Sequence, residues 1–65
     1  MFAKRLKELR LEKGLSQRQL AQELGYSNKT IALWENNTNI PSLENAKSLA
    51  LFFKVSIDYL AGLEN

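Results

Sequence analysis

The stretch that decides the fold is residues 17–36, which read QRQLAQELGYSNKTIALWEN. Ser16 stands directly before this stretch, and Gln19 follows three residues after that serine. The spacing is typical of a capping box, in which each side chain bonds a backbone N–H at the start of a helix. Ser27 is a second N-cap, and Gly25 ends the first helix because glycine readily adopts the left-handed conformation. The stretch therefore predicts two short helices joined by a tight turn.

The two helices carry the residues needed to pack on each other. Ala21 is small enough to allow a close approach, and Ile31 is apolar where the second helix meets the first. On a helical wheel of about 100° per residue, the second helix has two distinct faces. The inward face holds Thr30, Ile31 and Trp34, and the outward face holds Asn28, Lys29, Ala32 and Leu33. This combination predicts a helix-turn-helix over about residues 17–36, with polar side chains turned outward.

Three further helices are expected around this pair. The first runs from about Phe2 to Lys13 and stops at Gly14, the fourth runs from the Ser42 cap to about Phe53, and the last runs from the Ser56 cap through Leu60 to a stop near Gly62. The inward residues of the fourth helix are Leu43, Ala46, Leu49, Ala50 and Phe53. Strand signals are absent. We therefore expect an all-α fold, a compact five-helix bundle that forms one domain over residues 1–65.

Composition excludes several classes of function. The chain has no cysteine and no histidine, so disulfides, thiolate metal sites and the commonest general base are missing. Together with the absence of a glycine-rich phosphate loop, this argues against an enzyme, a metal site, a cofactor or a small-molecule substrate. The longest apolar run, residues 49–53, is far too short to span a membrane. With no secretory signal at the amino terminus, a cytoplasmic location without a membrane partner is the expectation.

Charge is distributed unevenly along the chain. Residues 1–32 contain seven Lys or Arg and three Asp or Glu, whereas residues 33–65 contain two and four. A basic half on a chain of net charge +2 is consistent with a positive face that meets nucleic acid. It is equally consistent with the solvated surface of ordinary helices, so charge alone does not choose between the two.

An ordered set of short motifs carries a family resemblance. The motifs are residues 5–10 (RLKELR), 13–17 (KGLSQ), 20–21 (LA), 24–25 (LG), 30–31 (TI), 34–36 (WEN), 41–43 (PSL) and 55–60 (VSIDYL). In this order and spacing they resemble the Cro/CI-type (XRE-like) helix-turn-helix family, the DNA-binding domain of lambdoid phage repressors. The resemblance covers nearly the whole chain. It implies a lambda-repressor-like five-helix fold and a transcriptional regulator, in the first place a repressor, that binds double-stranded DNA.

The outward face of the third helix supplies candidate base contacts. Asn28 can bond adenine through two atoms, and Lys29 can reach the guanine acceptors in the major groove. Leu33 offers an apolar contact to a thymine methyl, or it packs on a neighbouring helix. Ser27 could touch a base or a phosphate, although its capping role alone explains it. Trp34 could stack on single-stranded bases, but its inward position favours the core, as does that of Phe53.

Candidate phosphate contacts surround this face. The resemblance implies that Gln17 binds a phosphate and braces the recognition helix, whereas an ordinary exposed polar residue is the alternative. Arg18 and Asn36 are further candidates, and the loop after Asn36 has Thr38 and Asn39 where the family often has Lys or Arg. The resemblance also implies a partly buried ion pair between Arg10 and Glu35, with Arg10 near a phosphate as well.

A homodimer is expected because one such module offers few contacts, and two copies can occupy half-sites about 34 Å apart. The resemblance places the dimer interface at Ile40, Pro41, Ile57 and Tyr59. Leu51 and Phe52 fall off the buried stripe and could extend this surface, pack on the fifth helix or meet another domain. The alternative function is a protein-interaction module, such as an antitoxin or adaptor, built on the same bundle.

Overall fold

Five α-helices make up the part of the chain that this computed structural model describes, residues 2–63. They are α1 (Phe2–Glu12), α2 (Gln17–Leu24), α3 (Asn28–Glu35), α4 (Leu43–Phe53) and α5 (Ile57–Ala61). Between residues 2 and 63 there is no strand. The all-α fold with five helices is confirmed.

All four serines expected to begin a helix do so. Each serine side chain accepts a hydrogen bond from the backbone N–H three residues later, in the pairs Ser16–Gln19, Ser27–Thr30, Ser42–Asn45 and Ser56–Tyr59. At Ser16 the capping box is complete, because the Gln19 side chain also accepts from the Ser16 backbone N–H at 2.8 Å. Such caps each contribute about 1 kcal/mol, which matters for helices as short as these.

The ends of the helices depend on left-handed residues. Gly25 closes α2 with φ 78°, as expected for the tight turn. The end of α4 was not foreseen: Lys54 adopts φ 58° there, and its N–H donates to the Ala50 and Leu51 carbonyls. A side chain with a Cβ is strained in this conformation, so Lys54 costs free energy that a glycine would not.

Replacing Lys54 with glycine should therefore raise the free energy of unfolding by up to about 1 kcal/mol, because the strain removed exceeds the entropy lost. Urea titration would measure the change. Lys47→Gly is the matched control, since it removes the same charge within the interior of α4 and should destabilise by about 1 kcal/mol. A Lys54→Gly protein that is less stable than the parent would contradict this assignment of strain.

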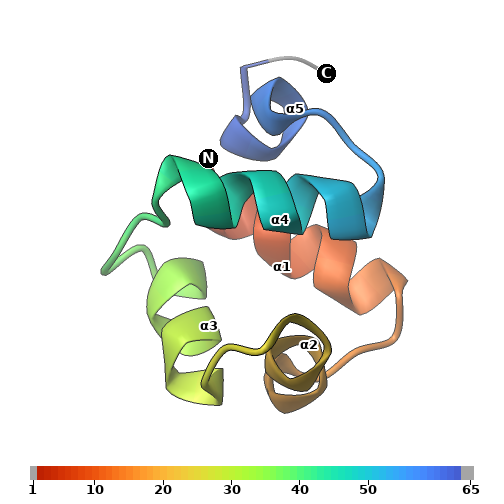
Figure 1. The fold of residues 1–65 in the computed structure, drawn as a ribbon, viewed down its shortest axis with the longest axis vertical. Coiled ribbons are helices and arrows are strands. Elements are labelled where there is room, and N and C mark those ends of the chain that lie inside the picture. Colours follow the sequence, from red (N-terminus) through yellow and green to blue (C-terminus); the bar gives the residue numbers. More distant parts are fainter. Residues whose placement is uncertain (1, 64–65) are drawn as a thin grey trace.

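The core lies between α1 and the helices around it. In Figure 1, α2 and α3 lie on one side of α1 and α5 lies on the other, with α4 running across α1. Buried apolar side chains come from all five helices: Leu6, Leu9, Leu20, Ala21, Ile31, Trp34, Leu49, Ala50, Phe53 and Leu60. Leu15, Val55 and Phe2 pack against this core. Trp34 and Phe53 are thus core residues, as the inward stripes indicated.

Leu43 corrects the expected stripe of α4. Helical periodicity predicts an inward position for Leu43, but the residue is 69% exposed. Helical side chains lean toward the helix amino terminus, so the first residue of α4 covers the approach to the helix and not the core beneath it. Ala46, one turn later, is only partly buried, and full burial begins at Leu49. The exposed Leu43 therefore adds an apolar side chain next to the connection that precedes α4.

The two unassigned residues at the end of α4 differ. Leu51 points to solvent, with 78% of its surface exposed. Phe52 packs partly against the core, where its ring meets that of Phe53 edge-on at 5.0 Å. The Lys13 ammonium lies 5.4 Å from the Phe52 ring centroid, which joins the end of α4 to the residue after α1. Within residues 2–63, no helix is long and apolar enough to cross a bilayer.

Candidate nucleic-acid interface

The third helix presents one buried and one exposed side. Ile31 and Trp34 are buried, whereas Asn28 and Lys29 at its start are exposed. Leu33 is half-buried, so its side chain still reaches the surface. The outward flank of α3 is thus not covered by the protein's own core, and the amide and ammonium groups at its start are accessible to a partner.

Aromatic contacts fix α3 against the rest of the bundle. The Trp34 ring meets Phe2 of α1 edge-on at 6.4 Å, and it meets Tyr26 of the turn edge-on at 5.2 Å. Such pairs contribute about 0.5–1.5 kcal/mol beyond the area they bury. Because Trp34 is held from two directions, the outward flank of α3 has a defined orientation.

The start of α3 carries two neighbouring hydroxyls. Ser27 Oγ accepts from the Thr30 N–H, and it lies 2.9 Å from Thr30 Oγ1. Thr30, placed on the inward face from the helical wheel, is only half-buried because its hydroxyl remains beside the exposed cap. Ser27 is therefore fully explained as a cap, and a contact from it to DNA stays a prediction.

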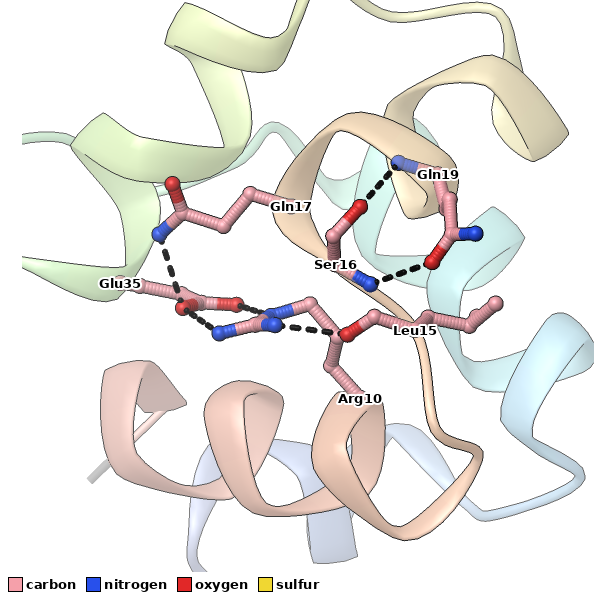
Figure 2. A network of polar contacts seen from close by, with 6 residues as sticks. All are labelled: Arg10, Leu15, Ser16, Gln17, Gln19 and Glu35. Atoms are coloured by element: carbon pink, nitrogen blue, oxygen red, sulfur yellow. Dashed lines mark hydrogen bonds and ion pairs between the residues drawn. The ribbon is translucent and has the colours of Figure 1, made fainter.

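A polar cluster joins α1, α2 and α3 at the last residue of α3 (Figure 2). Arg10 donates from Nε to Glu35 Oε2 at 2.7 Å and from Nη2 to Glu35 Oε1 at 2.9 Å. Its Nη1 donates to the Leu15 carbonyl at 2.7 Å. The two side chains are only 8% and 4% exposed, so this is a buried bidentate ion pair. The pairing that the family resemblance implied is present in the structure.

Gln17 belongs to the same cluster. Its Nε2 donates to Glu35 Oε1 at 3.1 Å, which ties the first residue of α2 to the last residue of α3. One hydrogen of the Gln17 amide is used in this bond, and the group has a second hydrogen to offer a phosphate. Arg10, in contrast, uses its charge within the protein and has little surface with which to reach a phosphate directly.

The connection after α3 winds back onto the helix end. The Asn36 side-chain oxygen accepts from the Thr38 N–H at 3.0 Å, and Asn37 has φ 66°. The backbone N–H groups of Thr38 and Asn39 both point at the Leu33 carbonyl, at 3.0 and 3.3 Å. Residues 36–39 are exposed and uncharged. They present polar groups beside α3 but add no positive charge.

The sequence-derived site residues therefore separate into two groups. Gln17, Arg18, Asn28, Lys29 and Asn36 lie at the ends of α2 and α3, the two helices that pack on each other side by side (Figure 1). Arg18 is exposed, next to the braced Gln17. The residues expected at the dimer interface lie elsewhere: Ile40 and Pro41 in the connection before α4, and Ile57 and Tyr59 on α5.

Ile40 is 81% exposed, whereas Pro41, Ile57 and Tyr59 are half-buried. A contact that sequence reasoning missed covers part of Tyr59. The Arg5 guanidinium lies 4.1 Å from the Tyr59 ring centroid, and Arg5 Nη1 donates to the Tyr59 carbonyl at 3.0 Å. Sequence spacing gives no signal for this pair, because α1 and α5 are brought together only by the tertiary fold. In the described residues, no group of three or more His, Cys, Asp or Glu could hold a metal ion.

Comparisons with known proteins agree with the helix-turn-helix fold. The sequence pattern of the family described as helix-turn-helix matches residues 6–60. The chain is 41% identical over 59 residues to the HTH-type transcriptional activator BcrR of Enterococcus faecalis, an alignment that covers 91% of this chain and 29% of that protein. It is 35% identical over 57 residues to the cryptic phage CTXphi transcriptional repressor RstR of Vibrio cholerae, covering 88% and 51%.

A third relative is the HTH-type transcriptional regulator ImmR of Bacillus subtilis (strain 168), 34% identical over 61 residues, covering 94% of this chain and 48% of that protein. The chain thus spans about half or less of the length of these curated relatives. Each alignment includes nearly all of the five-helix region and leaves the rest of the relative unmatched.

Proposed function

This chain belongs to the helix-turn-helix family of transcriptional regulators, and from that membership we propose that it binds a palindromic operator in double-stranded DNA as a homodimer. The family members matched here are regulators of transcription and not enzymes. The observation that carries the proposal is the accessible flank of α3, with Asn28 and Lys29 exposed while Ile31 and Trp34 hold the helix to the core.

In this proposal α3 enters the major groove and reads base edges. Asn28 bonds an adenine and Lys29 a guanine, because these side chains carry the donors and acceptors that match those bases. Leu33, one turn further along α3, meets a thymine methyl with the part of its side chain that remains exposed. Ser27, at the helix start, contributes a hydroxyl beside the first base or its phosphate.

Phosphate contacts come from the ends of the same two helices. Gln17 offers its second amide hydrogen, Arg18 offers charge, and Asn36 offers an amide beyond the end of α3. Arg10 supports these phosphate contacts indirectly. It binds Glu35, and Glu35 accepts the hydrogen bond that orients Gln17. We give Arg10 this role, and not a contact with a phosphate, because its side chain is 8% exposed.

The proposed interface has few positive charges, and this gives a measurable signature. Arg18 and Lys29 are the cations at the ends of α2 and α3 that face outward. Two copies would bring four of these positive charges to the duplex, at phosphates or at base edges, and release about four counterions, so the logarithm of affinity should fall with the logarithm of salt with a slope near −4. An interaction module that does not bind DNA predicts no such dependence on salt for its partner.

The second copy meets the first, in this proposal, through the connection before α4 and through α5. Ile40 is the most exposed large apolar residue there, and Leu43, Pro41, Ile57 and Tyr59 add to the surface. Pairing two modules makes the second half-site contact intramolecular, which raises the overall affinity well above that of one module.

Replacing Ile40 with Glu should weaken binding to a two-half-site duplex by about 10- to 100-fold, because the charge opposes burial of this surface while the fold is unaffected. Sedimentation with DNA and fluorescence anisotropy would measure the loss. Leu11→Glu places the same charge on an exposed leucine of α1 and serves as the control. If Ile40→Glu dimerises on DNA as the parent does, the proposed interface is wrong.

We further propose that the chain represses transcription. RstR is named as a repressor and BcrR as an activator, and both resemble this chain. A dimer seated across a promoter blocks polymerase without needing any further surface, which favours repression. A reporter gene under a promoter that contains the selected duplex would distinguish the two, since a repressor lowers its expression and an activator raises it.

A further inference from the structure

Tyr26 makes two contacts that are not needed for α3 to contact base edges. It lies in the turn between α2 and α3, one residue before the Ser27 cap. Its ring packs edge-on against Trp34 of α3 at 5.2 Å. Its hydroxyl donates to the Asn45 side-chain oxygen in α4 at 3.1 Å. One side chain therefore links the start of the recognition helix, the underside of that helix and the fourth helix.

Asn45, the residue that accepts the Tyr26 hydrogen bond, is itself held in place by a hydrogen bond. Asn45 lies in the first turn of α4, and its backbone N–H donates to the Ser42 hydroxyl that caps the helix. The connection that precedes this cap contains Ile40 and Pro41, the residues through which a second copy is proposed to dock. Tyr26 is thus bonded to the turn of α4 that adjoins the proposed dimer surface.

The way the helices pack explains why this link can affect the position of α3. The close packing of α2 and α3 forms one unit, and α4 packs most closely on α5. Figure 1 shows α2 and α3 on one side of α1 and α5 on the other, with α4 between the two groups. The angle between α3 and α4 therefore depends on side chains that join the α2–α3 unit to α4, as the Tyr26 hydroxyl does.

We propose that Tyr26 is a positioning residue that fixes α3 relative to the dimer surface and thereby selects the number of base pairs between two half-sites. The inference rests on the dimeric DNA binding proposed above. One base pair moves a half-site by about 3.4 Å and by roughly a tenth of a turn. A dimer can reject a spacing that differs by one base pair only if each recognition helix is held rigidly to its own dimer surface.

The test uses the duplex that the parent chain selects from a random library, together with versions carrying one base pair more or fewer at the centre. Tyr26→Phe keeps the ring on Trp34 and removes only the hydroxyl. We expect its preference for the original spacing to fall by about two- to tenfold, the range for one partly buried hydrogen bond. Affinity for a duplex with a single half-site should stay within twofold of the parent.

A second variant and a control make the result specific. Asn45→Ala removes the acceptor, and it should relax the spacing preference as Tyr26→Phe does, with no further loss in the double variant. Ser48→Ala removes a hydroxyl that bonds the Glu44 carbonyl within α4 and should leave the preference unchanged.

Two outcomes would overturn the inference. An unchanged spacing preference in Tyr26→Phe shows that the hydroxyl does not position α3. An equal loss on single and paired half-sites shows a role in folding only. Failure of the underlying dimeric binding has its own signature, since the parent chain would then bind all spacings equally or fail to select any duplex.

Discussion

Replacing Arg10 with Met should lower the free energy of unfolding by about 3–5 kcal/mol, the range for removing one partner of a buried ion pair. The Glu35 side chain, 4% exposed in the parent, would keep its bond from Gln17 but lose the guanidinium that neutralises it. For a domain of 65 residues this is most of the stability available. The variant should be only marginally stable at room temperature. The fluorescence of the buried Trp34 would report the loss in a urea titration.

Substitutions of two other arginines provide a comparison for the expected loss of stability. Arg5→Met should cost less than Arg10→Met, because it loses a contact with the Tyr59 ring and carbonyl without stranding a buried charge. Arg18→Met, at an exposed position, should cost least. Arg10→Met with Glu35→Leu should recover most of the stability, since no charge is then left unpaired. Equal effects of Arg10→Met and Arg5→Met would contradict this account of the pair.

The second large effect concerns recognition and not stability. Asn28→Ala combined with Lys29→Ala should reduce the preference for the selected duplex over a scrambled one by about a hundredfold or more. Each bidentate base contact is worth about 1–3 kcal/mol of discrimination, and two are removed from each protomer of the dimer. The slope of the logarithm of affinity against the logarithm of salt should also become shallower by about two, because a dimer loses two lysines. Competition binding at several salt concentrations would measure both.

Folding is not expected to limit this experiment, since both side chains are exposed at the start of α3. Lys47→Ala combined with Ser48→Ala removes an adjacent lysine and polar residue from the exposed face of α4 and provides the matched control. If the double variant in α3 selects the same duplex as tightly as the parent, the flank of α3 is not the reading surface. The protein-interaction alternative, such as an antitoxin or adaptor, would be favoured by a parent chain that selects no duplex at all.

Features set by neighbours in sequence were predictable. The serine caps depend on residues three apart, and the orientation of α3 depends on the period of the helix, so both were expected correctly. Asn37 adopts the left-handed conformation that asparagine tolerates. The inward placement of Leu43 was wrong, because helical periodicity says nothing about where the neighbouring helices end.

Contacts between residues that are far apart in the sequence could not be predicted from helical periodicity or residue spacing. Tyr26 and Asn45 are 19 positions apart, and nothing in the spacing indicates that they meet. The same holds for Arg5 and Tyr59, which are 54 apart. The pairing of Arg10 with Glu35 came from the family resemblance and not from periodicity. Lys54 was not foreseen because left-handed helix ends usually show a glycine.

The shared carboxylate of Glu35 has a consequence for how the chain opens. Helices of 8 to 11 residues are unstable on their own, so α1, α2 and α3 would otherwise be prone to detach one at a time. Detaching α1 or α2 would remove a donor from the buried Glu35 carboxylate, and detaching α3 would leave the Arg10 guanidinium without its partner. This penalises the separate unfolding of each helix, and we expect the three short helices to unfold as a single cooperative unit.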